Sequence, residues 1–342
     1  MKKAAVLLAV VAIGLFYALP AEGAYYYTHW TNSAGDNDYH NDDNWDTKID
    51  NVPGYHLAPP ETYDGNSWYV DMDKGGDDYA LVTGGSYSWK FFCGYWKPAK
   101  VVLAEGDYTF HPGSFTIGEA TPADQCQFIQ HGGTVEGSPV IGRDNGNNPF
   151  GNGWGEYIID GGTINGGKIT VASNRANYGL FQIVGTNPTI SISGYEQWPK
   201  GINKYGEESP GGWLKVILVG DGNGVSVIDC TNGDGEAVLS GTLHVDISQY
   251  TGDQTAIDII TAKSLVYKDH TKTYDPDASD DDPTQVPYPD LTLSDENIAA
   301  GFQLAERDNG DGTYTLQVVI PEPATLVLMG LGGCLVLLRR KK

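Results

Sequence analysis

The chain has little positive charge and no apolar run as long as a typical membrane-spanning helix. Its 342 residues include 21 Lys and Arg against 44 Asp and Glu, which gives a formal net charge of -23 at pH 7. Such a surface repels phosphate backbones and anionic membranes, so the counterion release that drives nucleic-acid binding is not open to it. We therefore exclude nucleic acid as a partner.

The sequence also lacks the common catalytic signatures. Its seven histidines include no pair at the spacing of a zinc site, and there is no Gly-x-Ser-x-Gly turn, phosphate loop or dinucleotide fingerprint. Carboxylates are so abundant that some pairs will lie by chance at the separation that glycosidases use. Their number therefore does not argue for catalysis, and we predict no catalytic residues and no required cofactor.

Residues 1–23 have the three parts of a secretory signal peptide. Two lysines precede an apolar run, and small residues lead up to Gly23. We predict a signal helix that is removed, so that the mature chain begins near Ala24 outside the cytoplasm.

Residues 321–342 form a second targeting segment. Pro321, Glu322 and Pro323 precede a run of 15 uncharged residues and a basic cluster that begins with Arg339 and Arg340. The run is slightly short for a bilayer, but terminal basic side chains can extend its reach. Because positive charge favours the cytoplasmic side, we predict a transmembrane helix with the body of the chain outside.

These three parts, in this order, resemble the PEP-CTERM sorting signal of exported bacterial surface proteins. The resemblance implies processing near Pro321-Glu322-Pro323 by an exosortase-like membrane protease. It also implies an inner-membrane intermediate and a final place at the cell surface or outside the cell. The resemblance covers only the C-terminal segment, so it does not say what the body does.

The body predicts short strands joined by turns. Runs rich in Val, Ile, Thr, Tyr and Phe alternate with clusters of Gly, Asn, Asp and Pro, and almost no stretch has the helical period. Residues 127–135 recur as residues 156–164 at an offset of 29, and Val140 and Ile169 keep this spacing. Weaker copies begin near Tyr108 and Phe181.

Such units indicate an all-β fold, a right-handed β-helix or β-solenoid with Gly-rich turns. One coil cannot bury its apolar stripe alone, so successive coils stack, and glycine permits the positive φ of sharp corners. Phe128 should then lie beside Tyr157, and Val135 beside Ile164. The alternative is a β-sandwich of Gly-rich hairpins.

We divide the body at about residue 100. Residues 24–100 hold five of the eight Trp and form a Trp-rich β region or cap, whereas residues 101–320 form the solenoid-like part with its closing strands.

Three of the four cysteines lie in the body, so at least one of them has no intramolecular partner. Cys93 and Cys126 flank neighbouring strands where the repeats begin. Because export leads to an oxidising compartment, we predict a disulfide between them.

Calcium is the one metal that the sequence suggests. Asp308 and Asp311 lie in an Asp-Asn-Gly-Asp-Gly run, which offers oxygen ligands on a tight loop. The terminal bidentate Glu of a calcium loop is missing, and hairpin turns favour the same residues for conformational reasons. A turn is therefore the competing interpretation.

Together these features predict an acidic, exported surface or biofilm-matrix protein with a structural or adhesive role and an association with extracellular polysaccharide. The alternatives are a polysaccharide lyase or glycoside hydrolase on a β-helix, and a carbohydrate-binding module with a line of exposed aromatics.

Overall fold

The computed structural model describes residues 24–64, 66–72, 79–95, 97–119, 126–143, 153–172, 178–198, 201–202, 208–209, 211–267 and 291–321. The predicted signal helix and transmembrane helix lie outside these residues. Within them, every helix is too short or too polar to cross a membrane.

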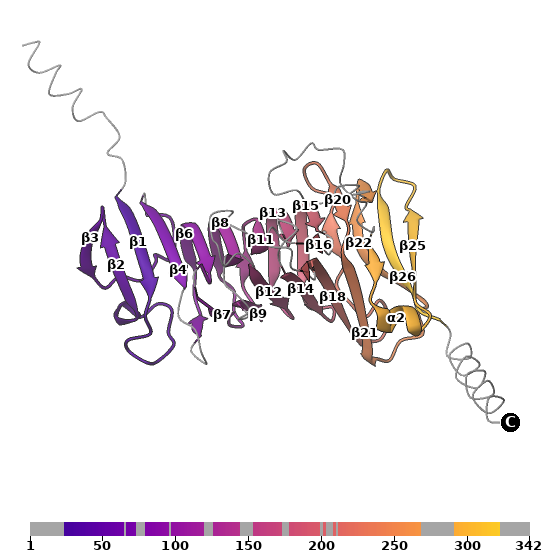
Figure 1. Cartoon of the computed structure of the whole chain (residues 1–342), viewed down its shortest axis with the longest axis horizontal. Coiled ribbons are helices and arrows are strands. Elements are labelled where there is room, and N and C mark those ends of the chain that lie inside the picture. The colour runs from indigo at the N-terminus through magenta and orange to yellow at the C-terminus, as the bar shows by residue number, and fades with distance from the viewer. Residues whose placement is uncertain are drawn as a thin grey trace, which may run out of the picture.

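The described chain is nearly all β, as predicted, and its strands lie side by side along an elongated body (Figure 1). The large sheet has sixteen strands in the described ranges. They are β1 (Tyr25–Trp30), β2 (Trp45–Ile49), β3 (Val52–Tyr55), β4 (Ser67–Met72), β6 (Ser86–Cys93), β8 (Thr109–Glu119), β10 (Thr134–Val135), β11 (Pro139–Arg143), β13 (Thr163–Val171), β15 (Thr189–Gln197), β19 (Ile228–Cys230), β20 (Glu236–Leu239), β22 (Ala256–Ala262), β23 (Ser264–Tyr267), β25 (Gln303–Asp308) and β26 (Tyr314–Val319).

A small sheet of eight described strands lies against it. Its strands are β5 (Ala80–Val82), β7 (Lys100–Leu103), β9 (Cys126–Gln130), β12 (Trp154–Ile159), β14 (Tyr178–Val184), β18 (Gly211–Gly220), β21 (Thr242–Tyr250) and β24 (Thr292–Leu293). Outside both sheets lie β16 (Gly201–Ile202), β17 (Glu208–Ser209), the 3₁₀ turn η1 (Asp42–Asn44) and the helix α2 (Asp295–Ala299).

The chain passes back and forth between the two sheets, and neighbouring strands run parallel over most of their length. Val135 pairs with Ile164 in the large sheet, and Phe128 pairs with Tyr157 in the small sheet. Both predicted contacts are confirmed. Parallel pairing between segments 29 residues apart is not the hairpin pairing that a sandwich would use.

Two details of the predicted alignment are wrong. Val140 pairs with Thr170 rather than Ile169, because β13 contains one residue more than the segment beside it. The copy that begins near Tyr108 does not align with Phe128, because Phe110 pairs with Val135 in the large sheet. Aromatic residues beside glycine occur in strands of both sheets, so this pattern alone does not assign a strand to its sheet.

The apolar core lies between the sheets. Alternate residues of each strand point inward and are fully buried, and Phe91, Phe115, Phe128 and Tyr157 meet there edge to face. One buried cluster runs from Trp30 to Ile320. Removing this surface from water drives the two sheets together, and the core is continuous across the boundary predicted near residue 100.

The Gly-Gly turns need glycine for two different reasons. Gly133 and Gly162 have φ of 65° and 78°, in the left-handed region that favours glycine. Gly161 lies against the preceding turn, where a Cβ atom would be 2.3 Å from the carbonyl oxygen of His131. The first glycine of the pair therefore permits close stacking, and the second permits the bend.

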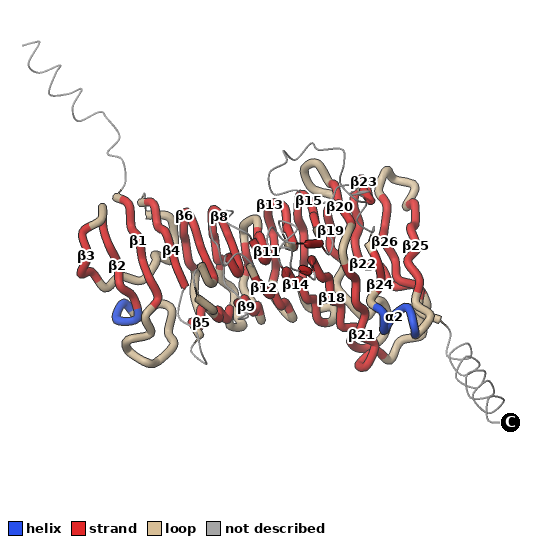
Figure 2. Tube along the Cα trace, viewed as in Figure 1, coloured by secondary structure: helices blue, strands red, loops and turns tan. Residues whose placement is uncertain are grey.

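Antiparallel strands close both ends of the large sheet. At the N-terminal end β2 pairs with β1 and β3, and at the C-terminal end β26 pairs with β22 and β25. Figure 2 shows one short helical segment near each end, η1 and α2.

Candidate functional site

A pocket of about 450 Å³ opens on the outer face of the small sheet, over β14, β18 and β21. We call it the β18 pocket. The residues at the start of α2 also line it. Its volume is within the range of ordinary ligand sites.

Strand alternation brings the lining side chains together. Leu180 pairs with Trp213, and Lys215 pairs with both Gln182 and His244. Their neighbours along the strands, such as Phe181 and Leu214, are buried in the core. Because successive residues of a strand point to opposite faces, the lining residues point outward.

One wall of the pocket is aromatic. Tyr178 lines it and stacks on Trp154 with ring centroids 4.0 Å apart and planes 29° apart. The indole nitrogens of Trp154 and Trp213 are buried and have no hydrogen-bond partner in the structure. Burial raises the pKa of Tyr178, and the charge of Glu156 adds to this effect. The phenol is therefore neutral at ordinary pH.

The other wall is polar. His244 Nδ1 lies 2.9 Å from Ser294 Oγ and 3.7 Å from the carboxylate of Glu296, whose side chain is 84% exposed. Burial lowers the pKa of His244, and the nearby charge of Lys215 lowers it further. Among the described residues, Lys215 forms no ion pair within 4 Å. The pocket therefore has charges of both signs, aromatic rings, and groups that donate and accept hydrogen bonds.

A second hollow, of about 580 Å³, lies over the Gly-Gly turns. His131 and Asp160 form an ion pair there across 2.8 Å, between turns 29 residues apart. Its lining includes three glycines and, unlike that of the β18 pocket, no aromatic side chain except His131, so we rank this hollow below the β18 pocket.

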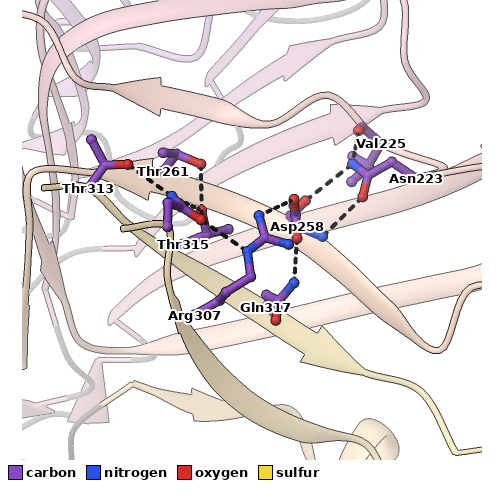
Figure 3. Close-up of polar contacts among 9 residues, drawn as sticks. Asn223, Val225, Asp258, Thr261, Arg307, Thr313, Thr315 and Gln317 are labelled. Atoms are coloured by element: carbon purple, nitrogen blue, oxygen red, sulfur yellow. Dashed lines mark hydrogen bonds and ion pairs between the residues drawn. The ribbon is translucent and has the colours of Figure 1, made fainter. Parts of the chain in front are cut away.

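A polar network joins the last hairpin to the rest of the fold (Figure 3). Asp258 on β22 accepts hydrogen bonds from Arg307 on β25 and Gln317 on β26, across 2.9 and 2.6 Å. On its other side, the backbone N–H of Asp258 donates to Asn223. The network ties three strands together, and we assign it a structural role.

Only the first residue of the sorting motif lies in the described chain. Pro321 comes two residues after the end of β26, and Ile320 is held by a hydrogen bond from its N–H to the carbonyl oxygen of Thr255. Glu322, Pro323, Arg339 and Arg340 lie outside the described residues.

The candidate calcium ligands Asp308 and Asp311 lie in the turn between β25 and β26. Asp308 accepts from the N–H of Gly310, and Asp311 accepts from the N–H and hydroxyl of Thr313. In the described part of the chain, no group of three acidic, His or Cys side chains is placed to hold a metal ion. The contacts favour the turn interpretation, and calcium binding stays a prediction.

Cys93 and Cys126 are both buried thiols in this structure, and Cys93 Sγ lies 3.4 Å from the carbonyl oxygen of Gln127. Sγ of Cys126 lies against Gly94, the residue that follows Cys93. The disulfide stays a prediction.

Sequence reasoning missed the β18 pocket. Its lining comes from three strands and from α2, at unequal spacings along the chain. One signal was available in β18, where Trp213 and Lys215 alternate with the apolar residues Leu214 and Val216. Such alternation indicates that Trp213 and Lys215 lie on the solvent-facing side of the strand, where a Trp is uncommon.

Comparison with known proteins identifies the C-terminal segment only. No protein of curated function and no solved structure matches the chain. Residues 319–342 match the PEP-CTERM protein-sorting motif. The chain therefore carries, directly after its last strand, the signal of an exported protein that is sorted by an exosortase.

Proposed function

We propose that this is a cell-surface protein whose body, a β-solenoid, has a structural or adhesive role and associates with extracellular polysaccharide. The sorting motif carries the proposal, because it begins at the end of β26 and so supports export of the whole two-sheet body. The in-register parallel pairing of β9 with β12 and of β10 with β13 supports the solenoid.

We propose a binding role rather than catalysis. The carboxylates that line the β18 pocket, Asp295 and Glu296, are consecutive residues of one short helix. Glycoside hydrolysis usually needs two carboxylates that flank the scissile bond from opposite sides. This arrangement supports a surface that holds a glycan without cleaving it.

The test uses the native host. Mass spectrometry of the surface fraction should find the chain without residues 1–23 and without the tail beyond the Pro-Glu-Pro motif. Deleting residues 321–323 should leave the tail attached and the protein in the membrane fraction. Recovery of intact tails at the surface would overturn the sorting part of the proposal. The same protein, incubated with polysaccharides, should release no reducing or unsaturated ends.

A further inference from the structure

A relay of hydrogen bonds in the β18 pocket fixes where His244 carries its proton. The side-chain amide of Asn297 is oriented by Val245, whose N–H donates to Oδ1 across 2.7 Å and whose carbonyl accepts from Nδ2 across 2.8 Å. The hydroxyl of Ser294 donates to the same Oδ1 across 3.0 Å.

A hydroxyl has only one proton to donate. Because Ser294 gives its proton to Asn297, its oxygen must accept the hydrogen bond from His244 Nδ1. The proton of the neutral imidazole is therefore on Nδ1, and Nε2 is left as a hydrogen-bond acceptor. This tautomer is assigned from the network around the ring.

Lys215 supplies the complementary group. It is in register with His244 on the neighbouring strand, at the strand spacing of about 4.8 Å. An ammonium group only donates hydrogen bonds. That of Lys215 forms no ion pair within 4 Å among the described residues, although its charge helps to lower the pKa of Asp246 on β21. The pocket thus presents a donor and an acceptor side by side, which matches two adjacent hydroxyl groups of a sugar ring.

The aromatic wall lies beside this pair. Trp213 is two residues before Lys215 on the same face of β18, with Leu180 next to it. An indole face offers a large apolar surface at little entropic cost to the C–H face of a sugar.

The charges favour an uncharged ligand. The lining includes two carboxylates, Asp295 and Glu296, and one ammonium group, that of Lys215, so its net charge is small. A chain of net charge -23 repels a polyanion over longer distances. A polycation is attracted at long range by the same net charge, but in the pocket its ammonium groups would lie against that of Lys215, so chitosan is the stricter competitor in the test.

We propose that the β18 pocket binds an uncharged polysaccharide, with Lys215 and His244 holding adjacent hydroxyl groups and Trp213 packing against a sugar ring. This inference rests on the proposed polysaccharide association and names its site and the class of glycan.

The test is the binding of the purified full-length chain to three polysaccharides: a neutral glucan, alginate as a polyanion and chitosan as a polycation. The glucan should bind, and its affinity should change little with salt, because no net charge is paired.

Trp213→Ala and Lys215→Met should each weaken glucan binding about tenfold or more, the effect of losing one good contact. Matched substitutions elsewhere, Trp89→Ala and Lys48→Met, should leave it unchanged, since both residues are exposed on the large sheet.

The role of His244 is tested through its hydrogen-bond partner Ser294. Ser294→Ala removes the acceptor for the Nδ1 proton and should weaken glucan binding, while the melting temperature reports separately on the loss of the α2 cap. Each outcome has one meaning. Glucan binding that none of the pocket variants changes overturns the site but leaves polysaccharide association standing. Binding to alginate or chitosan alone overturns the uncharged ligand. If the chain binds none of the three polysaccharides, both the inference and the proposed association are overturned.

Discussion

The phenolic hydroxyl of Tyr157 donates a hydrogen bond to the side-chain oxygen of Gln130 across 2.6 Å, and both side chains are fully buried. The amide of Gln130 in turn donates to the carbonyl oxygens of Gly133 and Thr163, across 3.1 Å each. One polar side chain inside the core thus satisfies groups from two successive coils.

Tyr157→Phe should therefore cost about 1–3 kcal/mol of unfolding free energy, because it leaves the oxygen of Gln130 buried without a donor. Urea denaturation measures the change. Tyr26→Phe is the control, since the Tyr26 ring stacks on Trp68 near the surface. Equal stability of both variants would mean that Gln130 is satisfied in another way.

Ile164→Ala should destabilise the fold by about 2–5 kcal/mol. Ile164 is fully buried and is in register with both Val135 and Ile190, so its truncation opens a cavity between three coils. Ile158→Ala, on the outer face of the small sheet, should cost much less. If the two variants unfold at the same denaturant concentration, the sheets do not enclose the core in this register.

Asp258→Asn should loosen the terminal hairpin. Arg307 loses its ion partner, and the two bonds shown in Figure 3 no longer meet at a charged acceptor. Because the pair is partly exposed, the global effect should be small, of the order of 1 kcal/mol or less. Hydrogen exchange should speed up in β25 and β26 and stay unchanged in β13. Uniform exchange across all strands would contradict a local role.

Asp311 should contribute stability only above acidic pH. Hydrogen bonds from the side chain and backbone of Thr313 lower its pKa below the ordinary value of 3.8. A carboxyl group whose pKa is lowered on folding stabilises the fold when it is ionised, and this contribution is lost as the pH falls through the lowered pKa. Asp311→Ala should therefore be less stable than the parent chain at pH 7 and converge with it near pH 2. An equal difference in stability between the two chains at pH 7 and at pH 2 would contradict this.

Cys93 and Cys126 should be joined in protein taken from the native cell surface. Closing a loop of roughly 30 residues would add about 3–4 kcal/mol in the chain-entropy account. Mass spectrometry after alkylation without reductant tests this. Alkylation of both thiols in the unfolded chain would refute the bond. Cys230 should resist alkylation in the folded protein, because burial raises the pKa of its thiol.

Local sequence was enough to predict strands, turns and two parallel strand pairs, β9 with β12 and β10 with β13. The offset of 29 is visible in the sequence because the Gly-Gly turns after Gln130 and Ile159 stack on each other. A side chain larger than glycine would clash there, so the two turns keep the same residues. The next pairs, Tyr157 with Phe181 and Phe181 with Leu214, have offsets of 24 and 33. The parallel strands keep their stacking while the loops between them vary in length, so a single period does not recover every strand pair.

The β18 pocket could not be predicted from the sequence for a related reason. Its members lie on strands that are adjacent only after stacking, and the closing residue Ser294 follows the pocket strands by about fifty residues. Propensity places Ser294 at the start of a helix, where its oxygen accepts from the N–H of Asn297. The contact with His244 exists only in the folded chain.

The position of β26 determines how force enters the molecule. This strand ends at Val319, the residue at which the match to the sorting motif begins, and it is hydrogen-bonded to β22 on one edge and to β25 on the other. A force applied at the C-terminal end of β26 would therefore be shared between two ladders of backbone hydrogen bonds before it reaches the parallel strands. A strand that is hydrogen-bonded on both edges resists being peeled from its sheet more than an edge strand does.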